Sequence, residues 1–106
     1  MSDNRPLSEQ FRIVAIEYSD AESAATLLEN VKDLTLQQRM AELDGDLPQN
    51  KREMMVKASQ EWADYIHEMT KARNKARRLK LQLEHIRMKF TEWNSAEANK
   101  RAEMKL

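Results

Sequence analysis

An unbroken heptad repeat from Trp62 to Trp93 constrains the fold of this chain more than any other feature. Alternating steps of three and four residues pass through apolar side chains only. The positions of this C-terminal seam are Trp62, Tyr65, Met69, Ala72, Ala76, Leu79, Leu83, Ile86, Phe90 and Trp93. Such spacing predicts one long α-helix that buries a narrow stripe, either within the chain or between chains. The pattern indicates architecture and carries no chemistry of its own.

The N-terminal part of the chain predicts a second long helix, from residue 8 to residue 43. Pro6 disfavours helical geometry at the residue before it, and Ser8 is placed to act as the N-cap. Gly45 supplies a left-handed stop after residue 43, and Pro48 delays the next helix. Half of the 106 residues are Ala, Glu, Lys, Leu or Arg, a composition typical of long helices.

Two apolar stripes follow this first predicted helix. The seam stripe is Phe11, Val14, Tyr18, Ala21, Ala25 and Leu28, and beyond it the apolar spacing takes a three-residue step that resembles a stammer. The second stripe is Ile13, Ile16, Ala24, Leu27, Val31 and Leu34. On the later helix, Leu81 and Met88 also lie off the seam. Two stripes on one helix indicate two neighbouring helices.

The sequence therefore predicts an all-α fold: a long antiparallel helical hairpin in a single domain, 1–106. Ser59 is placed as the N-cap of the second long helix, residues 60–104, and a loop with room for a short helix fills 44–59. A lone hairpin leaves its seam half exposed, so we expect the coiled coil to dimerise or oligomerise into a helical bundle.

Several classes of function lack the residues they need. There is no Cys, and the single Gly excludes glycine-rich phosphate loops. His67 and His85 are 18 positions apart, about 27 Å along a helix, so they cannot share a metal ion within one chain. No Ser has a neighbouring His as a base. We expect no enzyme activity, no cofactor, no metal and no small-molecule substrate.

No apolar run approaches the roughly 18 residues that span a bilayer. The first residues have neither the basic start nor the apolar block of a signal peptide. The absence of Cys fits a reducing compartment. We therefore expect no membrane partner and a cytoplasmic location.

The neutral total charge conceals an asymmetry between the two halves. Residues 1–50 hold 4 basic and 10 acidic side chains, a balance of −6, and residues 51–106 hold 14 and 8, a balance of +6. No acid lies between Glu68 and Glu84, where the basic segment consists of Lys71, Arg73, Lys75, Arg77, Arg78 and Lys80. Two interpretations stay open: pairing with Glu22, Glu29 and Asp33 of the first helix, or binding of nucleic acid. The seam aromatics could likewise stack on bases, although their heptad positions favour core burial.

The C-terminal half also carries a resemblance. Residues 86–93, IRMKFTEW, followed by residues 98–106, ANKRAEMKL, resemble the ending of small helical accessory proteins from the early, recombination-associated gene regions of tailed bacteriophages. The resemblance extends back to 59–65 and does not include the first helix. It implies an accessory protein in a bacterial host's cytoplasm, near single-stranded DNA or a recombinase, and implies no site residues.

The sequence thus predicts a non-enzymatic oligomeric coiled coil that binds an unidentified protein partner, as an accessory factor in phage DNA metabolism or recombination. The alternative is a module that binds single-stranded DNA weakly through the basic segment.

Overall fold

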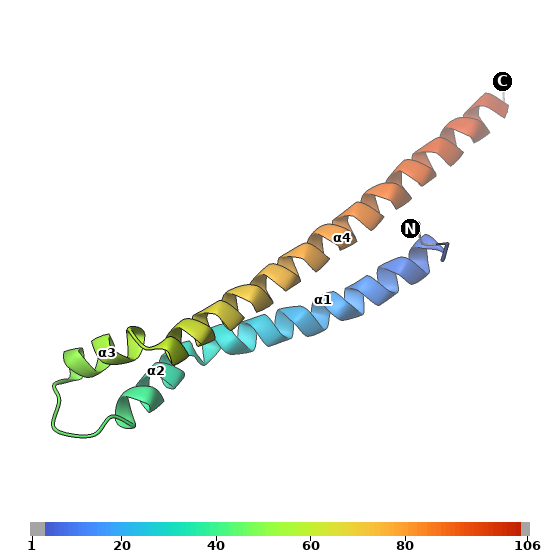
Figure 1. The fold of residues 1–106 in the computed structure, drawn as a ribbon. Helices are drawn as coiled ribbons and strands as arrows, with labels where there is room; N and C mark the ends of the chain where they lie inside the picture. The colour runs from blue at the N-terminus through green and yellow to red at the C-terminus, as the bar shows by residue number, and fades with distance from the viewer. Residues whose placement is uncertain (1–3, 105–106) are drawn as a thin grey trace. The chain divides into compact units, whose positions relative to one another are not determined.

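The computed structural model of the chain describes residues 4–104, and every regular element in that range is a helix (Figure 1). The elements are α1 (Leu7–Asn30), α2 (Lys32–Ala41), α3 (Gln49–Lys57) and α4 (Gln60–Met104). The predicted all-α helical hairpin is confirmed.

The contacts divide the chain into two units, and each contains part of both long helices. The first unit combines Met1–Asp20 with Arg77–Leu106, of which 4–20 and 77–104 are described, and the second is Ala21–Ala76. Within each unit, α1 and α4 run antiparallel. In the first unit the guanidinium carbon of Arg87 lies 6.0 Å from the ring centroid of Phe11. In the second unit Arg73 bonds Glu22 and Glu29.

The start of α4 lies where the sequence places it. The Ser59 hydroxyl oxygen accepts a hydrogen bond from the backbone N–H of Trp62 at 3.2 Å, which is N-cap geometry. The same hydroxyl donates to the Val56 carbonyl at 2.6 Å and so ties the end of α3 to the start of α4. With no Gly or Pro to interrupt it, α4 continues to Met104.

The predicted helix 8–43 is wrong in its continuity and in both of its ends. It begins at Leu7, where the Pro6 carbonyl accepts from the third and fourth residues after it, so Ser8 lies inside the first turn. It divides at Val31, which has φ −94° and ψ 5°, and α2 ends at Ala41. The Tyr65 hydroxyl donates to the Leu28 carbonyl at 2.5 Å. Because last-turn carbonyls lack intrahelical donors, Tyr65 stabilises the end of α1.

The tip of the second unit, made of α2, the loop 42–48, α3 and the first turns of α4, holds the largest apolar cluster of that unit. Its buried members are Leu36, Met40, Val56 and Trp62, and the half-buried Leu43, Tyr65 and Ile66 pack against them. In Figure 1, α2 and α3 lie side by side and the loop joins their far ends. The predicted short helix within 44–59 is therefore α3, packed into a core.

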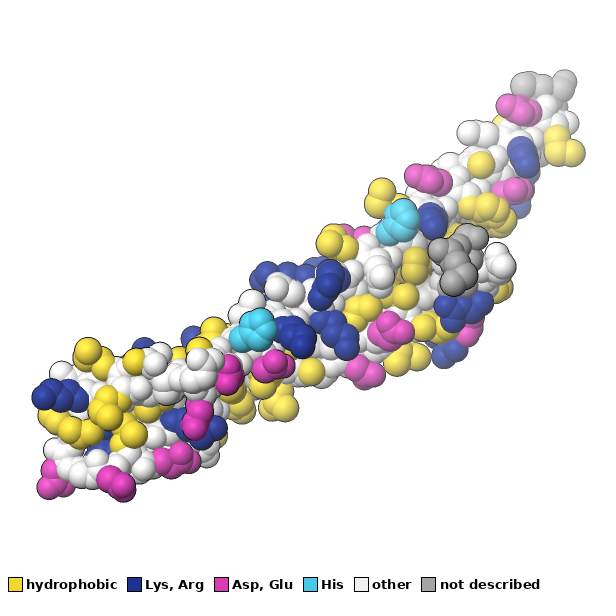
Figure 2. All heavy atoms as spheres, in the orientation of Figure 1, with side chains coloured by type: hydrophobic (Ala, Val, Ile, Leu, Met, Phe, Trp, Pro, Cys, Tyr) yellow, Lys and Arg dark blue, Asp and Glu magenta, His cyan; other side chains and the backbone are white. Residues whose placement is uncertain are grey.

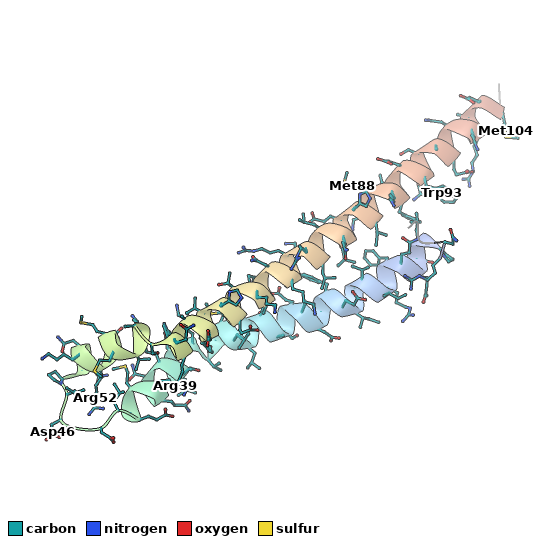
Figure 3. The ribbon with its side chains drawn as sticks, in the orientation of Figure 1. Arg39, Asp46, Arg52, Met88, Trp93 and Met104 are labelled. Atoms are coloured by element: carbon teal, nitrogen blue, oxygen red, sulfur yellow. The ribbon has the colours of Figure 1, made fainter. Side chains whose placement is uncertain are left out.

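Arg52 of α3 fastens the loop. Its guanidinium donates to the carbonyls of Met40 and Leu43 at 2.9 Å and of Leu47 at 3.0 Å, and it also bonds the Gly45 carbonyl (Figure 3). The Leu43, Gly45 and Leu47 carbonyls lie beyond the end of α2, where helix geometry supplies no donors, and the Met40 carbonyl also accepts from the Leu43 N–H at 3.2 Å. Gly45 has φ 89°, the left-handed conformation that the sequence indicates for this stop.

In the first unit, the C-terminal seam is buried only as far as α1 extends. Leu79 and Ile86 are each 8% exposed, whereas Phe90 is 48% and Trp93 56% exposed. Leu7, the first residue of α1, lines a cavity with Ile86 and Phe90, so α4 beyond Phe90 has no residue of α1 to face. Figure 3 shows Trp93 on this part of α4. Burial of Phe90 and Trp93 within the chain is thus corrected, and their role in an oligomer seam stays a prediction.

Candidate interaction surfaces

Most of the seam is used inside the chain. Trp62 and Ala76 are buried, and Tyr65, Met69, Ala72 and Leu83 are half-buried. The rings of Trp62 and Tyr65 stack on each other with their centroids 5.4 Å apart, so neither offers a free platform for a base. Phe90 and Trp93 also stack, at 6.3 Å, but this pair is exposed.

The basic segment separates into one engaged arginine and five exposed cations. Lys71, Lys75, Arg77, Arg78 and Lys80 are exposed and form no ion pair with any residue of 4–104. Each lies on α4 off the seam, and the space-filling view shows dark blue side chains gathered over this helix (Figure 2).

Arg73 is the engaged member of the segment. Its Nη1 lies 2.5 Å from Glu22 and its Nη2 2.6 Å from Glu29, while its Nε completes a bidentate pair with Glu29 at 2.9 Å. Nη2 also bonds the Thr26 hydroxyl at 3.2 Å. The hydrogen bonds to Glu29 raise the pKa of Arg73, partial burial opposes the rise, and Glu22 adds to it.

Arg73 therefore joins α1 to α4 and is not offered to nucleic acid. Of the acids expected to face the segment, Glu22 and Glu29 do so, and Asp33 is exposed without an ion pair in the described part of the chain. The pairing interpretation holds for this one cation.

Three large side chains of the second stripe of the first predicted helix are exposed, whereas Ile13 and Val31 are half-buried. Leu27 is 62% and Leu34 58% exposed, and Ile16 is 51% exposed. On α4, Leu81 is 64% and Met88 60% exposed. Apolar side chains of this size at regular helical spacing are typical of surfaces that another chain covers.

A groove with a basic rim opens between α1 and α4 in the first unit. It has a volume of about 390 Å³ and is lined by Arg5, Gln10, Val14, Leu81, Gln82, His85, Ile86 and Lys89. Val14 and Ile86 form its apolar floor together with the exposed Leu81. None of the lining residues is acidic. We call this feature the basic groove.

The two His side chains are exposed on α4, and His85 lies at the basic groove. Among residues 4–104 there is no cluster of three His, Cys, Asp or Glu side chains that could hold a metal ion. The pKa of Glu9 is lowered and the pKa values of Arg12 and Arg73 are raised, in each case mainly by a hydrogen bond within an ion pair.

Two side chains that organise the structure escaped the sequence analysis. Arg52 acts on carbonyls, which every residue has, so its role depends on the path of the loop. Tyr65 was assigned to the seam from its spacing, but its hydroxyl bond to Leu28 has no signature in the sequence. The one sequence feature near this bond is the three-residue step in the apolar spacing after Leu28.

Comparison with protein-family models, with curated proteins and with solved structures finds no match to this chain. In the described part of the chain, no helix combines the length and the apolar character that crossing a membrane requires.

Proposed function

We propose that this chain is a non-enzymatic coiled-coil protein that associates with itself and acts as a protein–protein interaction factor. The observation that carries the proposal is the exposed second stripe, with Leu27 62% and Leu34 58% exposed on the face of α1 and α2 away from the seam. Removing such side chains from water is favourable at roughly 25 cal/mol per Å² of apolar surface. A second apolar face on a helix whose seam is already buried or half-buried supports a binding role.

The chemistry of the described residues supports binding over catalysis. No polar or charged side chain among them is buried, so no carboxyl or imidazole is held in the apolar surroundings that tune a catalytic group. The cavities are shallow surface features between helices, and the basic groove has a mainly apolar floor. This setting favours contact with another helix.

The biological setting belongs to the proposal as well. The resemblance of the C-terminal half to small phage proteins supports an accessory role in DNA metabolism or recombination, in the cytoplasm of a bacterial host. The protein partner is to be identified by pull-down from infected cells, with a Leu27→Ser, Leu34→Ser double variant as the matched control. A partner retained equally by both proteins would show that the second stripe is not its binding surface.

Light scattering coupled to size exclusion tests the self-association. At about 50 µM, an interface with a Kd in the micromolar range is largely occupied, so we expect at least twice the mass of one chain. A single-chain mass at this concentration would remove self-association from the proposal and leave the binding of another protein.

The second candidate function is weak binding of single-stranded DNA, favoured by the exposed aromatic pair and by the five cations that form no ion pair among residues 4–104. Arg77, Arg78 and Lys80 lie in the same unit as Phe90 and Trp93. Cations that contact phosphates combined with exposed rings that stack on bases are the usual elements of single-strand binding. The acidic side chains of α1 repel the nucleic acid, so we expect low affinity.

Fluorescence anisotropy with a labelled oligonucleotide at about 50 mM salt tests this candidate, because phosphate binding weakens steeply as salt rises. The Arg77→Gln, Arg78→Gln variant should bind less tightly with its helicity unchanged. Its control is Lys51→Gln, Lys57→Gln, which removes the same charge from α3. Equal affinities of the two variants, or no binding by the parent, would exclude the basic segment as a nucleic-acid site.

A further inference from the structure

Four apolar residues of the second unit form one continuous stripe across the break between α1 and α2, in which Ala24, Leu27 and Leu34 are exposed and Val31 is half-buried. Ala24, Leu27, Val31 and Leu34 follow one another in steps of three, four and three, which places them on one helical face. The Val31 N–H donates to the Leu27 carbonyl at 3.1 Å, and the Thr35 N–H to the Val31 carbonyl at 2.8 Å. These bonds keep the helical path through the break. We call these four residues the outer stripe.

The surroundings of the outer stripe are acidic. No basic side chain occurs between Arg12 and Lys32, and Lys32 is the one basic residue in the sequence from Ala24 to Leu34. Asp20, one turn before Ala24 on the same face, is exposed, and so is Asp33 beside Leu34. Neither aspartate forms an ion pair within 4–104. Because Arg73 already holds Glu22 and Glu29, Asp20 of α1 and Asp33 of α2 are the acids beside the outer stripe that form no ion pair among residues 4–104.

The basic groove of the first unit has the opposite character. Its apolar floor of Val14, Leu81 and Ile86 is bordered by His85 and Lys89. Arg78, three positions before Leu81, is exposed and forms no ion pair in the described residues. The groove thus offers an apolar floor with cations beside it, whereas the outer stripe offers apolar side chains with acids beside them.

We infer that the outer stripe of one copy of this chain docks into the basic groove of a second copy. Leu27 and Leu34 cover Leu81 and the groove floor, while Asp20 and Asp33 approach Arg78 and Lys89. The inference rests on the proposed self-association and deepens it by naming the two surfaces. Charge complementarity identifies the occupant: residues 1–50 carry −6 and residues 51–106 carry +6, so each copy holds both halves of the contact.

A two-fold axis would let the same pair of chains make this contact twice, as in most homodimers. Both surfaces are then covered in a closed dimer and no copy is left with a free stripe. A contact made only once would leave one stripe and one groove open and would allow growth into longer assemblies. Because closed two-fold dimers are by far the commonest assemblies of identical chains, we expect a defined dimer over a mixture of sizes.

Complementary charge reversal tests the contact. Asp20→Lys with Asp33→Lys reverses the border of the stripe, and Arg78→Glu with Lys89→Glu reverses the rim of the groove. Each double variant alone places like charges opposite each other and should dissociate about tenfold or more easily in analytical ultracentrifugation. A one-to-one mixture of the two should associate like the parent, because both of its contacts again join opposite charges.

Two controls separate this effect from changes of fold or net charge. Lys51→Glu with Lys57→Glu changes the net charge as much as the groove variant but lies on α3, so its association should match the parent. Circular dichroism should show the same helicity for all variants. Leu27→Ser with Leu34→Ser should abolish dimerisation, whereas Met54→Ser, on an equally exposed residue of α3, should leave it intact.

Each outcome has one meaning. A parent protein that stays monomeric removes the proposed self-association itself. A dimeric parent whose charge variants remain dimeric overturns the inference and leaves the proposed function standing. Weakened variants that fail to associate on mixing overturn the pairing of these two surfaces, and an acidic protein that competes for the groove would be the alternative occupant.

Discussion

The two ends of the C-terminal seam, at Trp62 in the tip of the second unit and at Trp93 in the first unit, share one apolar pattern and differ in packing. At the tip, Trp62 begins the heptad seam and is 8% exposed; near the other end of the seam, Trp93 is 56% exposed. The tip has α2 and α3 beside it, whereas α4 beyond Phe90 has no facing residue of α1. A heptad pattern thus shows which side chains can be buried, and they are buried only where another helix faces them.

The largest expected difference is between the two tryptophans. Trp62→Ala removes a buried side chain from the tip cluster and should lower the free energy of unfolding by about 3 to 5 kcal/mol. Trp93→Ala should change it by less than about 0.5 kcal/mol, because the ring is largely in water already. Urea unfolding followed by circular dichroism measures both values. Equal losses would mean that Trp93 is buried in solution, as an oligomer seam requires.

Arg52 is expected to give the next largest effect. Arg52→Gln leaves carbonyls of α2 and the loop without their donor and should cost about 2 to 3 kcal/mol, since hydrogen bonds to charged groups exceed neutral ones. Arg39→Gln is the matched control, because its ion pairs with Glu42 and Glu61 are exposed and contribute less than about 1 kcal/mol. Chemical denaturation compares the two. A smaller loss for Arg52 than for Arg39 would show that the loop needs no fastening.

The N-cap of α4 should give a smaller effect. Ser59→Ala removes the hydroxyl that accepts from Trp62 and should cost about 1 kcal/mol. Ser95→Ala, within the exposed part of α4, should be neutral or slightly stabilising because Ala favours helix more than Ser. The melting temperature should therefore fall for Ser59→Ala, and it should stay the same or rise slightly for Ser95→Ala. Similar destabilisation by both would contradict the assignment of Ser59 as a cap.

The smallest effect should be confined to the end of α4. Ala98→Gly lowers local helix propensity by about 1 kcal/mol, but because no residue of α1 faces α4 beyond Phe90, the loss should not reach global unfolding. Ala76→Gly, at a residue 1% exposed, carries the same propensity cost into the folded core. Hydrogen exchange should show faster opening near residue 98 in the first variant and a lower global stability only in the second.

Much of this architecture follows from the sequence, for identifiable reasons. The long helix 60–104 could be delimited because Ser59 is a strong capping residue and nothing interrupts the heptads after it. The break at Val31 could not, because it involves no Gly or Pro and its stabilising bond comes from Tyr65, far along the chain. A change in the spacing of apolar residues indicates where a helix meets new neighbours. It does not indicate whether the backbone bends or breaks there.

The candidate surfaces were only partly predictable. Sequence spacing located the second stripe, and its Ile16, Leu27 and Leu34 are exposed, as two-faced patterning implies. Sequence spacing could not distinguish Arg73 from the neighbouring cations. Which cation pairs with Glu22 and Glu29 depends on the exact register of α1 against α4. The basic groove escaped notice for the same reason: Val14 and His85 meet only once α1 and α4 are paired.

The sequence separation of the contacts between the helices also predicts the order in which they form during folding. Arg39 and Glu61 close a loop of 22 positions, and Arg73 and Glu22 one of 51, whereas Phe11 reaches Arg87. Loop closure costs about 0.6 kcal/mol more for each doubling of length, so the shortest of these three closures should form first. The contacts between α1 and α4 then form after those at α2 and α3, in order of increasing sequence separation. Folding kinetics should give higher φ-values for Val56→Ala than for Ile86→Ala, and the reverse order would show that the long helices pair before the turn that joins them.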